Sequence, residues 1–166
     1  MESTRELKPL MLAPSALKLA VAESVTAGHL QALVATVSGA SQFFEGGITA
    51  YTLEQKVRHL RVDRTHAETV ECVSEIVAQQ MALGAAQLFN ADVAVATTGF
   101  AEAPPAKRGA IPFAFWALCH RLGARDVSIS GRFDAVDAHD RVTAQQAIAQ
   151  HVLTQLVRYL RNWRRK

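Results

Sequence analysis

The sequence contains little of what builds disulfide frameworks or metal sites. Its only two cysteines, Cys72 and Cys119, form neither a CxxC pair nor a regular spacing, so neither a disulfide framework nor a zinc knuckle is indicated. The six histidines show no HExxH or similar spacing, the pattern typical of histidine-bound zinc. We therefore expect two buried thiols, no metal and no cofactor.

Long apolar runs are also missing. No segment approaches the roughly 18 to 20 unbroken apolar residues of a membrane span, and the N-terminus lacks the order of basic, apolar and small residues of a signal peptide. With 49% apolar residues, the chain has enough hydrophobic material for one core. We expect a cytoplasmic protein with no membrane contact, built as a single domain over residues 1–166.

The positive charge is concentrated at one end of the chain. The formal net charge is +3, but five positive charges lie in the last nine residues, so the preceding residues together carry −2. These five are Arg158, Arg161, Arg164, Arg165 and Lys166. Basic side chains suit the C-terminus of a helix, and they also attract phosphates. No helix-turn-helix, RNA-recognition or OB-fold pattern accompanies them, so we do not expect a nucleic-acid partner, and an accessory role on nucleic acid stays a rival.

Strand-like and helix-like segments alternate along the chain. Residues 1–14 suit a short leading helix or a loosely held arm, and 101–109 reads as a loop. Short apolar runs predict strands over 17–22, 48–51, 92–97, 111–118 and 127–130. Helical spacing of apolar residues predicts helices over 30–37, 53–60, 73–88 and 136–163.

This alternation predicts a three-layer α/β/α sandwich with a largely parallel or mixed sheet. Such sheets bind ligands in the crevice beyond the carboxyl ends of their strands. The predicted strand ends carry Glu23-Ser24, Tyr51 and Thr98-Gly99. We expect the functional site at that edge.

Hydroxyl side chains and one lysine there suit acyl chemistry. A serine nucleophile needs a base, and a lysine kept neutral by a desolvating pocket can serve, with a tyrosine holding the geometry. Backbone N–H groups at Thr98-Gly99 would stabilise an oxyanion, and the helix start near Thr26 to Gly28 would receive a phosphate. The alternative for each is structural: a helix cap for a serine, a half-buried strand residue for Tyr51 and a solvated helix face for Lys56.

Four segments of the chain resemble successive blocks of the CinA C-terminal family. They are AESVTAG (22–28), GASQFFEGGITAYTLEQK (39–56), VSEIVAQQMALGA (73–85) and ADVAVATTG (91–99). The resemblance implies an α/β protein that hydrolyses the amide of nicotinamide mononucleotide, a pyridine nucleotide, releasing ammonia. It also implies a homodimer or higher homo-oligomer.

The resemblance also implies roles for individual residues. Ser41 matches the position that we take for the nucleophile, with Ser24 as second choice, Lys56 matches the base, and Tyr51 matches their hydrogen-bonding partner. Further matches are expected to contact the substrate: Ser24 and Thr98 line the site, and Arg141 holds the phosphate, with Arg132 as the alternative.

The chain departs from the family pattern at positions expected to face the ligand. Val25 and Ala27 stand where cysteine and glycine are usual, Glu102 places a carboxylate near an anionic substrate, and Phe113 brings bulk into a segment that usually carries glycine. Two alternatives to the amidase follow: a changed substrate preference, or a weak or inactive homologue that binds a nucleotide or acts as a competence- or damage-associated partner protein.

Overall fold

The computed structural model describes residues 2–102, 110–123 and 125–165, and its centre is a five-stranded sheet in the order β2-β1-β3-β4-β5. The strands are β1 (Leu19–Glu23), β2 (Phe44–Thr49), β3 (Val93–Phe100), β4 (Phe113–Leu122) and β5 (Arg125–Asp134). β1 pairs in parallel with β2 and β3, whereas β3, β4 and β5 pair antiparallel. The sheet is therefore mixed.

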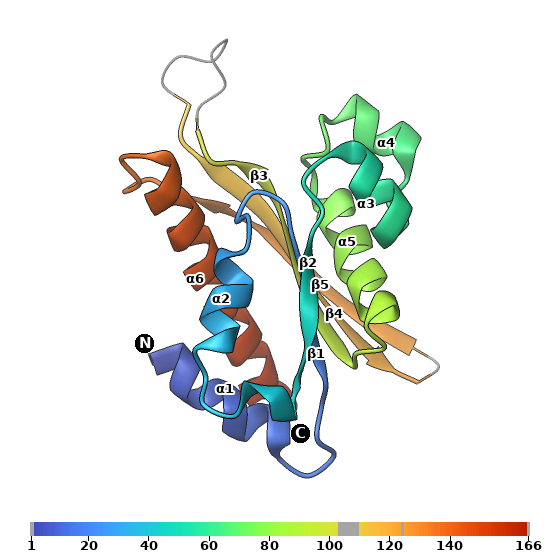
Figure 1. Cartoon of the computed structure of the whole chain (residues 1–166), viewed down its shortest axis with the longest axis vertical. Helices are drawn as coiled ribbons and strands as arrows, with labels where there is room; N and C mark the ends of the chain where they lie inside the picture. The colour runs from blue at the N-terminus through green and yellow to red at the C-terminus, as the bar shows by residue number, and fades with distance from the viewer. Residues whose placement is uncertain (1, 103–109, 124, 166) are drawn as a thin grey trace.

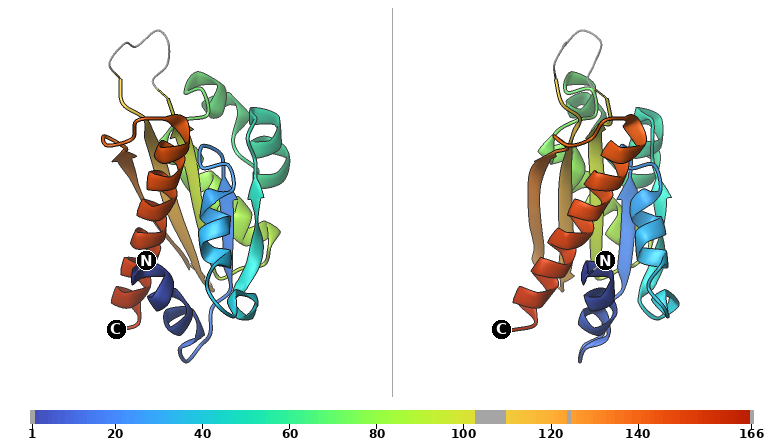
Figure 2. Two further views of the ribbon diagram at one scale, coloured as in Figure 1. Left: turned by 60° about the vertical axis from the view of Figure 1, so that its left-hand side comes forward. Right: turned by 90° about the vertical axis from the view of Figure 1, so that its left-hand side faces the viewer.

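Helices cover both faces of the sheet (Figure 1). They are α1 (Glu2–Leu12), α2 (His29–Ala35), α3 (Leu53–Leu60), α4 (Arg64–Thr69), α5 (Glu75–Leu88) and α6 (Arg141–Trp163), with a short 3₁₀ turn, η1 (Ala40–Gln42). On one face α1, α2 and α6 lie together, as Figure 2 shows, and on the other lie α3, α4 and α5. The predicted three-layer α/β/α fold is confirmed.

The two faces of the sheet differ in side-chain size because successive residues of a strand point to opposite sides. In β3, Val93 and Val95 pack toward α6, whereas Ala94 and Ala96 pack toward α5. The small side chains on the second face let α5 approach closely. On the side of α5 that faces α3, a methyl group at Gly84 would lie 2.2 Å from the carbonyl oxygen of Leu60, the last residue of α3.

The N-terminal and C-terminal helices of the chain contact each other. Of the two alternatives for the start of the chain, a helix or a loosely held arm, the helix is observed over Glu2–Leu12. This helix, α1, packs on α6 with its Leu7 side chain fully buried. Arg161 pairs with Glu6 at 2.7 Å, and Arg164 donates to the carbonyl oxygens of Leu10 and Pro14. Two of the basic residues at the end of the chain therefore stabilise the fold from the C-terminus of α6.

Several elements differ from the sequence prediction, among them β2, α4 and α6. β2 begins at Phe44 rather than residue 48, because its Gly46-Gly47 pair hides the apolar alternation of an edge strand. α6 begins only at Arg141, and α4 was missed because a six-residue helix with one buried side chain, Ala67, has no apolar period. Among the described residues, no helix is long and apolar enough to cross a membrane.

Candidate functional site

A cavity of about 520 Å³ opens beyond the carboxyl ends of β1 and β3, at the end of the molecule opposite both termini (Figure 1). This is the predicted edge of the sheet, and the volume suits a small-molecule ligand. Its lining comes from the turn after β1, the segment before α3 and α3 itself, the turn before α5, the end of β3 with the residues after it, and the start of α6. The lining residues are Ser24, Val25, Tyr51, Lys56, Glu71, Cys72, Val73, Thr98, Gly99, Phe100, Ala101, Glu102 and Arg141.

Lys56 and Ser24 form a hydrogen-bonded pair at the base of this cavity. Lys56 lies on α3, which Thr52 caps, and its side chain is only 1% exposed. Its Nζ atom lies 2.9 Å from Ser24 Oγ and also donates to the carbonyl oxygen of Tyr51 at 2.9 Å. Burial lowers the pKa of Lys56, and no ion pair with a carboxylate is found for it in the described part of the chain. The buried lysine therefore loses its proton more readily than a solvated lysine does.

Glu23 fixes the turn that carries Ser24. Its carboxylate is fully buried and accepts hydrogen bonds from the backbone N–H groups of Gly28, Leu30 and Gln31 at 2.8 to 3.0 Å. The carboxylate thus provides acceptors for the backbone N–H groups at the start of α2, which have no partner within the helix, and its negative charge complements the helix dipole. The sequence analysis did not assign Glu23 a role, although an acidic residue between a buried strand and a helix start is a signal for such a cap.

The start of α2 does not serve as the predicted phosphate site. The N–H group of Gly28 is taken by Glu23, and Thr26 is buried with its hydroxyl 2.7 Å from that of Thr97. Neither Thr26 nor Gly28 lines the cavity. Because the buried carboxylate already occupies these donors, this prediction is wrong.

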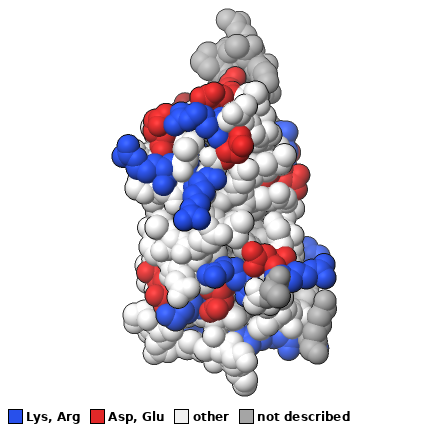
Figure 3. Space-filling view, turned by 90° about the vertical axis from the view of Figure 1, so that its right-hand side faces the viewer, with Lys and Arg blue, Asp and Glu red and all other residues white. Residues whose placement is uncertain are grey.

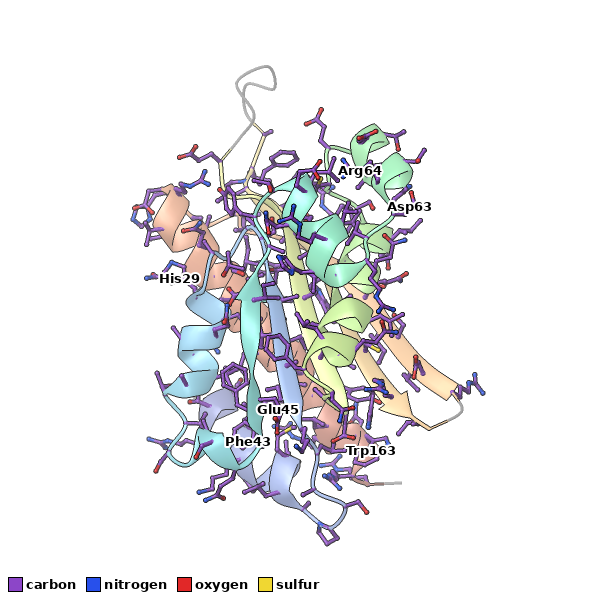
Figure 4. The ribbon with its side chains drawn as sticks, turned by 45° about the vertical axis from the view of Figure 1, so that its right-hand side comes forward. His29, Phe43, Glu45, Asp63, Arg64 and Trp163 are labelled. Carbon is purple, nitrogen blue, oxygen red and sulfur yellow. The ribbon has the colours of Figure 1, made fainter. Side chains whose placement is uncertain are left out.

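The predicted pairing of Ser41 with Lys56 is also wrong. Ser41 is exposed in η1, before β2 begins, whereas Lys56 follows the end of β2. The six residues of β2 separate the two by roughly 20 Å at about 3.3 Å per residue. Figure 4 shows the neighbouring Phe43 and Glu45 at one end of the molecule and Asp63 and Arg64, beside α3, at the other. Ser24, the second choice, is the serine that contacts the lysine.

Tyr51 and Arg141 form the rim of the cavity. The Tyr51 ring is 51% exposed, and its hydroxyl accepts a hydrogen bond from Arg141 Nη2 at 2.5 Å. Arg141 begins α6 directly after the helix cap Asp140, and its Nη1 lies 3.4 Å from a carboxylate oxygen of Glu102. Tyr51 thus accepts a hydrogen bond from Lys56 with its backbone carbonyl oxygen and one from Arg141 with its side-chain hydroxyl.

Thr98 and Gly99 close the cavity at the end of β3. The Thr98 hydroxyl donates to the carbonyl oxygen of Cys72 at 2.6 Å. A methyl group at Gly99 would lie 2.2 Å from the carbonyl oxygen of Phe113, so only glycine fits between β3 and β4 here. Cys72 is half-buried and lines the cavity, rather than being fully buried as predicted.

Comparison with known proteins decides the family of this chain. The family model of the CinA C-terminal domain matches residues 2–160. The chain belongs to the CinA C-terminal domain family. A CinA-like protein of Picosynechococcus sp. is 51% identical over 83 residues, covering 50% of this chain and 20% of that protein. One of Chlorobium limicola is 46% identical over 91 residues, covering 55% of this chain and 21% of that protein.

Solved structures of CinA proteins share the fold. The crystal structure of competence damage-inducible protein A from Klebsiella pneumoniae matches with a TM-score of 0.83 and 26% sequence identity, covering 98% of this chain and 97% of that one. The structural match thus covers nearly the full length of both chains, whereas the sequence matches span about a fifth of the length of the two curated relatives.

Of the residues that depart from the CinA pattern, some line the cavity and others do not. Val25 and Glu102 line it, whereas Phe113 lies outside it beneath Arg132, whose guanidinium is 4.0 Å from the ring centre and pairs with Asp134. Arg132 is therefore no alternative to Arg141 in the cavity. Among the described residues, no group of three or more His, Cys, Asp or Glu side chains is arranged to hold a metal.

Proposed function

We propose that this chain is an amidohydrolase that acts on nicotinamide mononucleotide or a related pyridine-nucleotide amide, with Ser24 as nucleophile and Lys56 as base. The observation that carries the proposal is the 2.9 Å contact between Lys56 Nζ and Ser24 Oγ at the base of a cavity. A buried amine with a lowered pKa beside a serine hydroxyl is an arrangement that can activate the serine for acyl transfer.

In the first step, the lysine activates the serine. Neutral Lys56 donates one N–H to the carbonyl oxygen of Tyr51, which orients the nitrogen lone pair toward Ser24. The lone pair takes the proton of Ser24 Oγ as that oxygen attacks the amide carbonyl carbon. The bond formed is the Oγ–C bond, and the carbonyl oxygen becomes an oxyanion.

One backbone N–H group is available for this oxyanion. Val25 lines the cavity, and no partner within the described chain is found for its N–H group, whereas Ser24 N donates to Thr97 O and Ala27 N donates to Ser24 O. Val25 follows the nucleophile directly, which is where an oxyanion donor commonly lies. We assign the oxyanion to the Val25 N–H group in place of Thr98-Gly99.

The second half of the reaction releases the products. The protonated Lys56 gives its proton to the amide nitrogen, the C–N bond breaks, and ammonia leaves. Water then attacks the ester carbon of the acylated Ser24, with Lys56 again as base, which returns the serine and releases the carboxylate. Arg141 and Tyr51, at the rim, hold the part of the substrate beyond the amide.

The direct test is incubation with nicotinamide mononucleotide while ammonia and nicotinate mononucleotide are measured. We expect turnover by the wild type and a loss of about 10³-fold or more in Ser24→Ala and Lys56→Met. Ser41→Ala is the matched control, and we expect it to keep full activity because Ser41 lies outside the cavity. Activity retained by Ser24→Ala, or lost by folded Ser41→Ala, contradicts the assignment.

A second candidate function is ligand binding without catalysis. It is favoured by the contact of Glu102 with Arg141, since a carboxylate there opposes an anionic substrate. Such a protein would gain thermal stability on adding a nucleotide through mass action but would form no ammonia over long incubation at high enzyme concentration.

A further inference from the structure

A polar side chain of α6 reaches the turn that follows β1. Gln145 Nε2 donates to the carbonyl oxygen of Val25 at 2.9 Å, across 120 positions of the sequence. Gln145 is only 7% exposed, and the buried residues of α6 beside it include Ala144 and Ile148. An amide in such a place is unfavourable unless it is hydrogen-bonded. Gln145 does not line the cavity, whereas Val25 does, so Gln145 acts on a ligand only through the Val25 backbone.

The bond from Gln145 holds the peptide group on one side of Val25. The peptide group on the other side is held by the bond from Ala27 N to the carbonyl oxygen of Ser24 at 3.2 Å. Because peptide groups are planar, holding both carbonyl oxygens restricts φ and ψ of Val25 and with them the direction of its N–H group. Within the described chain, Gln145 is the one donor found for the Val25 carbonyl oxygen.

We propose that Gln145 is a positioning residue that aims the Val25 N–H group at the oxyanion formed when Ser24 attacks a substrate. The inference rests on the proposed function and adds α6 to the elements that the reaction needs. Without the bond from Gln145, the peptide groups beside Val25 rotate more freely, and the N–H group spends less time in the productive direction. A donor that is held in place before the reaction stabilises developing charge better than a mobile one.

A purely structural role for Gln145 gives a different result. If Gln145 only satisfies a buried carbonyl group, its loss lowers stability and leaves the reaction of Ser24 unchanged. If it positions Val25, its loss lowers the rate of the step that forms the oxyanion. The ligand concentration that half-saturates the cavity then stays the same, because the ligand does not touch Gln145. Removing an oxyanion donor outright costs about 10²- to 10³-fold in rate, so we expect a loss on the order of tenfold when the donor is only misdirected.

The test follows the reaction of Ser24 with an alkyl fluorophosphonate, which does not depend on the natural substrate. Ser24 Oγ forms a bond to phosphorus, its proton passes to Lys56, and the P–F bond breaks to release fluoride, while the phosphoryl oxygen takes the oxyanion position. Intact-mass spectrometry at several probe concentrations gives the maximal rate constant and the half-saturating concentration. Gln145→Met removes the donor at similar side-chain length. Gln145→Asn withdraws the donor by one methylene and carries the test if the methionine variant does not fold.

Two other glutamines provide matched controls. Gln146→Met is the same change at the next position of α6, which is exposed. Gln79→Met removes a partly buried hydrogen bond, from Gln79 Nε2 to Ser130 Oγ at 2.8 Å, and so lowers stability without a contact to the cavity. Gln79 lies on α5, in the layer that forms the face shown in Figure 3, where acidic and basic side chains are intermixed, whereas α6 covers the opposite face of the sheet.

The outcomes separate this inference from the proposed function. We expect Gln145→Met to lower the maximal rate constant on the order of tenfold at an unchanged half-saturating concentration, and both controls to react like the wild type. An unchanged rate in the folded Gln145 variants, an equal loss in Gln79→Met, a change in half-saturation alone, or no labelling of Ser24 in the wild type overturns the inference. Hydrolysis of nicotinamide mononucleotide is measured separately. If labelling depends on Gln145 but no ammonia forms, the positioning role stands and the amidase function fails.

Discussion

The amine of Lys56 lies 2.9 Å from the hydroxyl of Ser24, although 32 positions separate the two residues in the sequence. Each partner is held by a different neighbour. The Tyr51 carbonyl oxygen binds the lysine, and the buried Glu23 carboxylate fixes the turn that carries the serine. In the proposed mechanism this arrangement places a desolvated base next to a nucleophile before any substrate arrives, which is the pre-organisation that catalysis uses.

Replacing Lys56 with methionine should remove activity and raise stability. Burial lowers the pKa of Lys56 below its ordinary value of 10.5, so between the two pKa values the unfolded chain binds more protons than the folded one. Stability of the wild type therefore rises with pH through that window. We expect the free energy of unfolding of Lys56→Met to be about 1 kcal/mol higher than that of the wild type at pH 7. We also expect it not to rise with pH through that window. Urea denaturation at pH 7 and pH 9 measures both, and a less stable variant with an unchanged slope contradicts the account.

Glu23→Gln should destabilise the fold and disturb the site. The carboxylate accepts three backbone N–H groups in a buried place, and an amide offers one acceptor and an opposing donor there. We expect a loss of about 2 to 3 kcal/mol. Glu68→Gln, on the exposed surface of α4, should change stability by no more than about 0.5 kcal/mol. Equal urea midpoints for the two variants would show that Glu23 is not a structural cap.

Ala27→Gly should stabilise the chain. Ala27 has a φ of 49°, in the left-handed region, where the methyl group is unfavourable. We expect a gain of up to about 1 kcal/mol. The matched opposite change is Gly28→Ala. Gly28 has a φ of 104°, and a Cβ added there would meet no atom within 4 Å, so the stability lost by this variant reports backbone strain alone. Thermal unfolding of both variants measures the pair, and a destabilised Ala27→Gly contradicts the strain argument.

The two cysteines should differ in reactivity. Burial, together with the nearby Asp126, raises the pKa of Cys119 to about 11, so at pH 8 almost none of its thiol is ionised. Cys72 is half-buried in the cavity lining. We expect a thiol reagent to label one cysteine in the folded chain and two in denaturant, and to block amide turnover. Folded Cys72→Ser should resist labelling, and rapid labelling of that variant contradicts the prediction.

The main elements of the fold are predictable because their signals are local. The apolar run of β3 and the apolar spacing along α5 and α6 follow directly from burial on a sheet or helix face. The short α4 gives no such signal, since its start depends on the Asp63 cap and on the ion pair between Arg64 and Glu54.

The site is less predictable than the fold because it depends on which segments meet in space. Ser24, Tyr51 and Lys56 follow strand ends, and Thr98 lies near the end of β3, all at one edge of the sheet. The rule that parallel strands end at a common edge brings these residues together. Ser41 precedes β2, so the same rule places it at the opposite edge of the sheet, away from the cavity. Position along the strand therefore indicates Ser24 as the serine that contacts Lys56, whereas similarity of motif indicates Ser41.

The most direct test of the central claim identifies the acylated residue. Wild-type chain is mixed with nicotinamide mononucleotide at high enzyme concentration, quenched in acid within milliseconds, digested and analysed by mass spectrometry, alongside Ser24→Ala and Ser41→Ala. The account predicts a pyridine-carboxyl ester on the peptide containing Ser24, present in Ser41→Ala and absent from Ser24→Ala. An ester on the peptide containing Ser41, or turnover that persists in Ser24→Ala, would contradict it.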